Sequence, residues 1–187
     1  MEKIKLILVL TFSLFFISLG YTQSYYQVSG ILEGTDRATG KSFKLVCENN
    51  FGQVRLYNFN NSYVRVPWER KDGQPISEEI AFGYVNTFES NDDGTFQQAR
   101  DIFLNRLTRN KLDFVGYNFR TILYINSSTG KVTDVEFIFL DSSPFANWSP
   151  GTYYEIMEDY KNNMPAFKVS STGRLMNYVL RSWVEEW

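Results

Sequence analysis

The stretch YNFRTILYINSSTGKVTDVEFIFL, residues 117–140, decides how this chain folds. Its first part, residues 117–125, is rich in aromatic and branched side chains, which is typical of a β-strand. Its last part, residues 132–140, places apolar side chains on one face of a second strand, at Val135, Phe137 and Phe139. Between them, residues 126–130 have the composition of a turn that ends in glycine. The stretch therefore predicts an antiparallel β-hairpin.

A helix is predicted on either side of this hairpin, and a last strand follows. A capping box over residues 95–98 and apolar residues at helical spacing predict a helix over 96–109. The Ser-Pro pair at 149–150 starts a second helix, whose core-facing residues are Tyr153, Ile156, Met157 and Tyr160. Alternation over residues 174–184 indicates the last strand. The order α-β-β-α-β predicts an α+β fold, a small antiparallel sheet covered by helices.

The residues before the α-β-β-α-β region are predicted to form a series of short strands separated by polar turns. Four strands are expected at residues 25–32, 42–48, 53–59 and 63–68, and the ambiguous segment 80–88 resembles a fifth. We therefore expect a β-rich N-terminal half over residues 23–94 and the α+β region over residues 95–187. The sequence leaves open whether the two regions share one sheet.

The chain begins with a candidate export signal. Lys3 and Lys5 precede a largely apolar run from Leu6 to Leu19, which is short compared with the roughly 20 residues of a membrane span. Small residues allow signal peptidase to cleave after Gly20 or Thr22. We expect a signal peptide over residues 1–22 and no stable membrane anchor after cleavage, with an uncleaved anchor as the alternative.

The composition excludes several classes of protein. The 187 residues include no histidine, so a Ser-His-Asp triad, a Cys-His dyad and a histidine-based zinc site are all excluded. The single cysteine, Cys47, can form neither an internal disulfide nor a multi-thiolate metal site. A net charge of −2 argues against a general nucleic-acid binder. We expect no cofactor, no metal and no nucleic-acid partner.

The missing histidine also bears on pH dependence. Between about pH 6 and 8 only an unusually perturbed group or the α-amino terminus can titrate in such a chain. We therefore expect ligand binding to vary little across that range.

The residues from 119 to 184 resemble the C-terminal domain of TonB-type energy transducers. That family shows a strand, a turn of glycine with a basic residue and valine, a second strand, a helix, a Met-Pro-x-aromatic motif, a glycine and a final strand. The matching positions here are 119–125, Gly130-Lys131-Val132, 135–140, 153–163, Met164-Pro165-Ala166-Phe167, Gly173 and 175–184. The chain as a whole resembles exported proteins of the Bacteroidota.

In the transducer family this domain binds an extended peptide of an outer-membrane receptor along a sheet edge. The resemblance therefore implies a binding edge on the last strand, with partner-binding residues Leu175, Asn177, Val179, Arg181 and Trp183. The alternative is an ordinary edge strand, which Glu185 and Glu186 protect against pairing. A membrane anchor and a proline-rich spacer, which transducers carry, are not expected here, so the resemblance implies a fold and an envelope setting but no transmission of force.

Three functions follow from these observations. The leading interpretation is a non-catalytic protein in the periplasm or outer envelope of a Gram-negative bacterium, which binds another protein or peptide. The alternative is a carbohydrate-binding or glycan-uptake accessory protein, whose stacking aromatic residues would be Tyr63, Trp68, Trp148 and Trp183. A third interpretation is a hydrolase with two acids about 5–10 Å apart. Its candidate pairs are Asp134 with Glu136 and Glu155 with Asp159.

Overall fold

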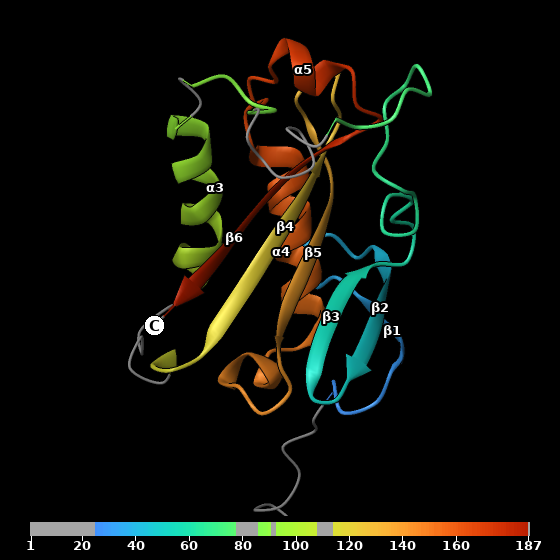
Figure 1. Ribbon diagram of the computed structural model, residues 1–187. Helices are drawn as coiled ribbons and strands as arrows, with labels where there is room; N and C mark the ends of the chain where they lie inside the picture. The colour runs from blue at the N-terminus through green and yellow to red at the C-terminus, as the bar shows by residue number, and fades with distance from the viewer. Residues whose placement is uncertain (1–24, 78–85, 91–92, 108–113, 187) are drawn as a thin grey trace, which may run out of the picture.

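The computed structural model describes residues 25–77, 86–90, 93–107 and 114–186. Six strands in this part of the chain form one sheet in the order β1-β2-β3-β5-β4-β6, and each neighbouring pair is antiparallel (Figure 1). The strands are β1 (Gly30–Thr35), β2 (Ser42–Asn50), β3 (Gln53–Asn58), β4 (Asn118–Ile125), β5 (Val132–Leu140) and β6 (Val179–Glu186). The helices are α3 (Asp93–Arg106), the 3-10 turn η2 (Pro144–Asn147), α4 (Pro150–Asn163) and α5 (Ser171–Arg174).

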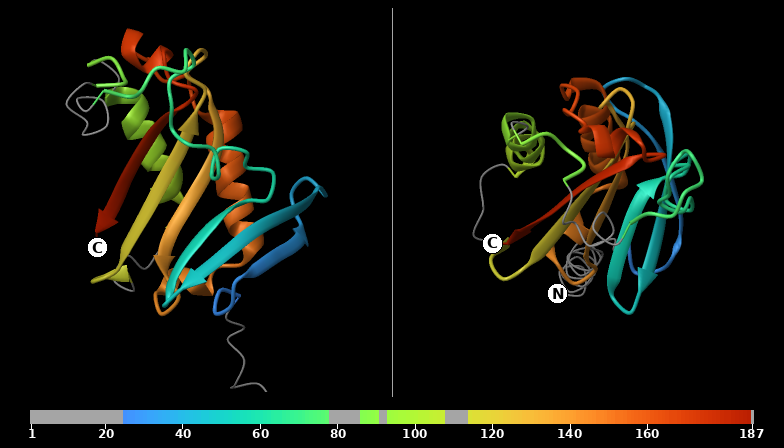
Figure 2. Two further views of the ribbon diagram at one scale, coloured as in Figure 1. Left: turned by 45° about the vertical axis from the view of Figure 1, so that its right-hand side comes forward. Right: turned by 45° about the horizontal axis from the view of Figure 1, so that its top comes forward.

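The fold is α+β, and its two long helices lie on the same side of the sheet (Figure 2). Phe103 of α3 stacks on Phe119 of β4 with ring centroids 4.2 Å apart, and Tyr153 of α4 stacks on Phe139 of β5 at 5.2 Å. We call this side the covered face and the other side the open face. No helix within the described ranges is long and apolar enough to cross a membrane.

The predicted hairpin is confirmed as β4 and β5. Their register runs from Arg120 opposite Ile138 to Ile125 opposite Val132, with an irregularity beside Ile125. The turn between them ends at Gly130, whose φ of +72° is a left-handed conformation that glycine adopts without strain. The asparagine side chain at the start of the turn accepts hydrogen bonds from the backbone of the next residues, which is the usual role of asparagine in such turns.

The two predicted regions share one sheet. β3 belongs to the first region and β5 to the second, and they pair from Gln53 opposite Leu140 to Tyr57 opposite Glu136. The boundary placed at residue 94 therefore does not separate two sheets. This long-range pairing joins residues that no local sequence pattern relates to one another.

Several predicted bounds were wrong. The strand expected at 25–32 is β1, which begins at Gly30, and the helix expected at 96–109 is α3. The strand expected at 63–68 is absent from the structure: residues 63–66 form turns and bends, and the Asn61 side chain accepts hydrogen bonds from the backbone N–H groups of Tyr63 and Val64. The ambiguous segment 80–88 lies mostly outside the described residues, as does the predicted signal peptide.

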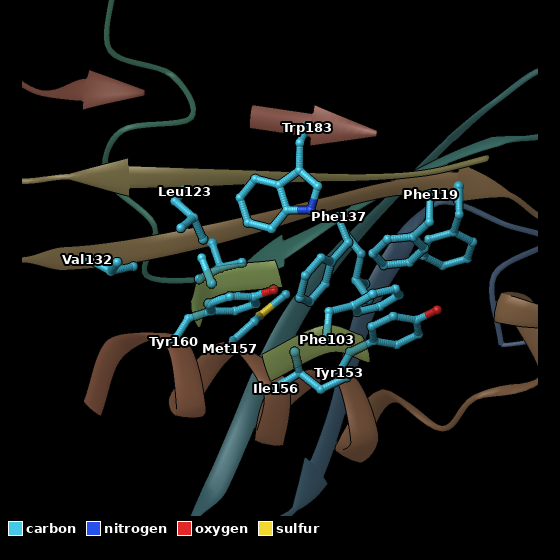
Figure 3. Close-up of a cluster of buried hydrophobic side chains, with 14 of the residues drawn as sticks. Phe103, Phe119, Leu123, Val132, Phe137, Tyr153, Ile156, Met157, Tyr160 and Trp183 are labelled. Atoms are coloured by element: carbon cyan, nitrogen blue, oxygen red, sulfur yellow. The ribbon is translucent and has the colours of Figure 1, made fainter. Parts of the chain in front are cut away.

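The helix expected after the Ser-Pro pair is confirmed as α4. Ser149 caps it, since its hydroxyl oxygen accepts a 3.2 Å hydrogen bond from the backbone of Thr152. Its apolar face and the covered face of the sheet form an aromatic core, in which the side chains of both point toward one another (Figure 3). The rings of Phe103, Phe119, Phe137, Phe145, Tyr153 and Tyr160 are all fully buried in this core.

Candidate functional site: the β6 edge and the open face

β6 forms one edge of the sheet. It pairs with β4 from Asn118 opposite Glu186 to Ile125 opposite Val179, and no described strand lies on its other side. An edge strand carries a row of backbone N–H and C=O groups that are available to another chain. We call this row, over residues 179–186, the β6 edge.

The side chains of β6 alternate between the two faces. Val179 and Trp183 are buried on the covered face, where the indole of Trp183 contacts Phe96 of α3 and Tyr160 of α4. The guanidinium of Arg181 lies 4.4 Å from the Phe96 ring centroid, in cation–π contact. These three predicted partner-binding residues therefore lie on the covered face, where Val179 and Trp183 are buried and Arg181 is half-buried.

The other two predicted partner-binding residues lie before β6. Leu175 caps the short helix α5, and Asn177 donates a 2.9 Å hydrogen bond to the backbone oxygen of Pro67. The residues that β6 presents on the open face are Leu180, Ser182, Val184 and Glu186, all of them exposed. Alternation in the sequence identified the strand but did not indicate which of its two sets of side chains faces the core.

A shallow hollow of about 300 Å³ lies on the open face next to β6. Its apolar lining includes Ile138, Leu140 and Val184, of which Leu140 is 45% exposed and Val184 is 38% exposed. Arg120 lies opposite both Ile138 and Val184 in the strand register. The Arg120 guanidinium has no hydrogen-bond or ion-pair partner among the described residues. We call these residues, with Gln53 and Asn118 at the rim, the open-face hollow.

A charged network lies beside this hollow on the same face. Glu136 is only 1% exposed, and its carboxylate accepts two hydrogen bonds from the Arg55 guanidinium, at 2.5 and 2.9 Å. The Tyr124 hydroxyl donates a third, at 2.7 Å. These hydrogen bonds raise the pKa of Arg55, and burial raises the pKa of Tyr124. Glu48 completes the network by accepting from Tyr57 at 2.6 Å, so both carboxylates are neutralised or hydrogen-bonded.

The four aromatic residues predicted to stack on sugar rings do not form one surface. Tyr63 stacks on Tyr124 at 6.0 Å, and Trp68 donates to the backbone of Tyr178, so both cover one end of the open face. Trp148 and Trp183 lie on the covered face, each in contact with other aromatic rings. Counting aromatic residues did not separate core residues from surface residues.

Most of the acids predicted for a hydrolase are bound by arginine. Glu155 and Asp159 of α4 both form ion pairs with Arg106 of α3, at 3.3 and 2.5 Å. Glu136 is engaged by Arg55, as described above. Asp134 has no hydrogen-bond or ion-pair partner within the described ranges. The structure therefore offers no pair of free carboxylates among these four residues.

Comparison with known proteins identifies a family. The sequence model of a family described as Domain of unknown function (DUF5043) matches residues 33–183. The crystal structure of a DUF5043 family protein from Bacteroides uniformis ATCC 8492 superposes with a TM-score of 0.70 at 23% identity, covering 89% of this chain and 95% of that one. At this identity the likeness shows the fold alone. No curated protein matches.

The resemblance to TonB-type transducers was wrong. The family model that matches is a different one, and it begins at residue 33, in the region that the resemblance did not cover. The fold also differs from the expected unit, since β5 pairs with β3 as well as with β4. A hairpin, a helix and a strand in this order recur in many antiparallel sheets, so their order alone did not identify a family.

Proposed function

We propose that this chain, which belongs to the DUF5043 family, is an exported protein of a Gram-negative cell envelope that binds another protein or peptide and catalyses no reaction. Its charged and apolar start, residues 1–22, supports export to the periplasm or outer envelope. The observation that carries the binding proposal is the β6 edge, which adjoins the open-face hollow at Val184.

In this proposal an extended segment of the partner adds to the sheet as a further strand beside β6. Its backbone pairs with the free N–H and C=O groups of the β6 edge, and its alternate side chains lie beside Leu180 and Val184 on the open face. The unpaired guanidinium of Arg120 lies opposite Val184 and favours an acidic side chain in the partner. Apolar contact and one charge then select the partner, while backbone pairing supplies affinity.

The opposite edge of the sheet supports the choice of β6. β1 has six residues and β6 has eight, so β1 offers fewer backbone groups to a partner. β1 also contains Gly30 and Gly34, and a strand with glycine binds less well because glycine gives no side-chain contact. No apolar hollow adjoins β1 among those described, whereas the open-face hollow adjoins β6.

The proposal that the chain is not catalytic rests on the ion pairs formed by the acids considered for a hydrolase. Glu136 is held by Arg55, and Glu155 and Asp159 are held by Arg106. A carboxylate whose oxygen atoms are bound by an arginine of the same chain is not free to contact a substrate. Binding through backbone groups needs no titrating side chain, which agrees with a chain that has no histidine.

Photo-crosslinking in the native host tests this proposal. A photoreactive amino acid at Ser182, an exposed position on the open face of β6, should form a crosslink to one envelope protein. Leu180→Lys and Val184→Lys should each lower the crosslink yield about five-fold or more, since lysine on an edge strand disfavours strand pairing. A synthetic peptide from the captured protein should then show cross-strand nuclear Overhauser effects to residues 179–186.

Leu175→Lys is the matched control. Leu175 is 44% exposed, close to the 38% of Leu180, but it is the C-terminal cap residue of α5 and lies outside β6. This variant should leave the yield unchanged. A yield that survives both β6 substitutions, or that falls as much with Leu175→Lys, contradicts binding at the β6 edge. Recovery of the protein in the cytoplasm with residues 1–22 attached contradicts export.

A further inference from the structure

A second hollow lies beside α4, at the place where β3 separates from β5. The two strands pair as far as Tyr57 opposite Glu136, but β5 begins four residues earlier, at Val132. β3 instead follows β2, and the backbone N–H of Phe59 donates to the oxygen of Lys44 at 3.0 Å. Figure 1 shows the two strands diverging in front of α4.

The space that this separation leaves is a polar hollow of about 670 Å³, within the range of small-molecule sites. Its walls come from β2, β3, β5 and α4, so parts of the chain far apart in sequence form it. We call it the α4 hollow and define it by the residues that the argument uses: Asn58, Phe59, Asn60, Asp134, Glu158 and Lys161.

Asp134 is the notable acid of this hollow. Its carboxylate is half-buried and has no hydrogen-bond or ion-pair partner in the described part of the chain. Burial raises the pKa of Asp134 to about 6; the Lys161 ammonium opposes this effect and the Glu158 carboxylate adds to it. A carboxylate that stays half-buried without a partner costs stability, so its acceptor atoms are available to a ligand at little further cost.

The charges around Asp134 are balanced. Glu158 and Lys161 face it from α4 and form an ion pair at 2.8 Å, Lys44 of β2 forms an ion pair with Glu33 of β1 at 2.5 Å, and Glu136 on the same strand is bound to Arg55. Each lysine is therefore paired with a glutamate, and Asp134 is left without an ion-pair partner in the described part of the chain. A phosphate would meet the two carboxylates, and a metal ion would meet the two ammonium groups. A neutral ligand meets neither penalty.

The uncharged groups of the hollow add both kinds of polar contact and an aromatic surface. Asn60 is exposed and its side chain bonds to no described residue, while the Asn58 side-chain oxygen accepts from the Asn60 backbone and leaves its own amide N–H groups free. The ring of Phe59 is 50% exposed and lines the same hollow. Amides offer donors and acceptors side by side, as vicinal hydroxyl groups require.

We propose that the α4 hollow binds a neutral saccharide. Asp134 accepts hydrogen bonds from sugar hydroxyl groups, Asn58 and Asn60 donate and accept at its rim, and the ring of Phe59 covers the apolar face of a sugar ring. This site lies between β3, β5 and α4, whereas the proposed peptide site lies on β6 and the open face. Either site can exist without the other.

Titration with defined oligosaccharides tests this assignment. Cellohexaose, xylohexaose, maltohexaose and mannohexaose are added singly to the purified protein up to about 5 mM at pH 7.5, and backbone amide shifts are recorded by nuclear magnetic resonance. At least one of them should shift the amides of residues 58–60 and 133–134. Phe59→Ala and Asp134→Asn should each weaken that binding about ten-fold. Lowering the pH to 5 should weaken saccharide binding to the wild-type protein, because the Asp134 carboxylate gains a proton. The same change should not weaken binding to Asp134→Asn, which has no carboxylate at this position.

Phe51→Ala is the control for loss of an exposed ring, since Phe51 lies between β2 and β3, outside the α4 hollow, and its ring is fully exposed. It should leave the affinity unchanged. Circular dichroism of each variant checks that it is folded. Absence of any shift with all four oligosaccharides overturns the proposal. Binding that survives both Phe59→Ala and Asp134→Asn overturns it as well, as does binding whose shifts lie elsewhere.

Discussion

Replacing Asp134 by asparagine should stabilise this protein at neutral pH. The folded-state pKa of about 6 lies roughly two pH units above the ordinary value of 3.8, because burial disfavours the carboxylate. At about 1.4 kcal/mol for each pH unit, holding this group ionised in the folded state costs about 3 kcal/mol. Asp134 is only half-buried, so solvent screening halves the figure. We expect Asp134→Asn to raise the free energy of unfolding by about 1.5 kcal/mol at pH 7.5.

The sign of the effect follows from the direction of the pKa change. A group whose pKa is higher in the folded state favours folding most below its unfolded-state pKa, and that contribution is lost as the pH rises through the folded-state pKa. The wild-type protein therefore loses this contribution to its free energy of unfolding between about pH 4 and pH 6, and the loss is complete above about pH 6. The gain in Asp134→Asn should fall to about 0.5 kcal/mol at pH 4.5, where the folded wild type is already protonated.

Urea denaturation followed by tryptophan fluorescence at pH 4.5, 6 and 7.5 measures these differences. Asp101→Asn is a suitable control, because Asp101 is exposed and accepts one hydrogen bond from Gln97. It should change the free energy of unfolding by less than about 0.5 kcal/mol at each pH. Destabilisation by Asp134→Asn at pH 7.5, or an equal gain at all three pH values, would refute the reasoning.

Two further predictions concern the hairpin turn and the buried thiol. Gly130→Ala should lower the free energy of unfolding by about 2–4 kcal/mol, because Gly130 has positive φ and a Cβ would press against the carbonyl oxygen of Phe167. Gly40 also has positive φ but has open space around it, so Gly40→Ala should lower the free energy of unfolding by only about 1 kcal/mol. Equal losses for the two variants in a urea titration would contradict the steric explanation. Burial raises the pKa of Cys47 to about 11, so a thiol reagent at pH 8 should leave the folded protein unmodified and react once urea unfolds it; rapid labelling without denaturant contradicts this.

The elements predicted correctly are those whose signals are local. The Ser149–Pro150 pair defines the start of α4 through a cap that involves only the next few residues, and the hairpin turn ends at a glycine that the backbone requires. The last strand was placed too early because residues 170–174 form a helical turn. In this turn the Ser170 hydroxyl oxygen accepts a hydrogen bond from the backbone N–H of Gly173. The sequence of these residues has the same composition as an ordinary polar turn.

The candidate sites depend on long-range geometry, and the sequence could not supply it. Alternation along β6 fits either face, so the choice between Val179 with Trp183 and Leu180 with Val184 depended on where α3 and α4 pack. Asp134 was selected only as half of an acid pair. Its isolation arises because β3 leaves β5 beside it. Asp134 is thus an example of the unusually perturbed group that the expectation of little titration between pH 6 and 8 excepted but could not identify.

The strand order of the sheet has a consequence for the nascent chain. β4 lies inside the sheet, between β5 and β6, yet β6 is made last among the described elements. Until residues 179–186 emerge, β4 is itself a sheet edge, and its apolar residues Phe119 and Leu123 lack their final neighbour. A chain stalled before residue 179 therefore exposes an edge strand of the same length but more apolar than that of the mature protein, which makes late synthesis its period of greatest risk of misassembly.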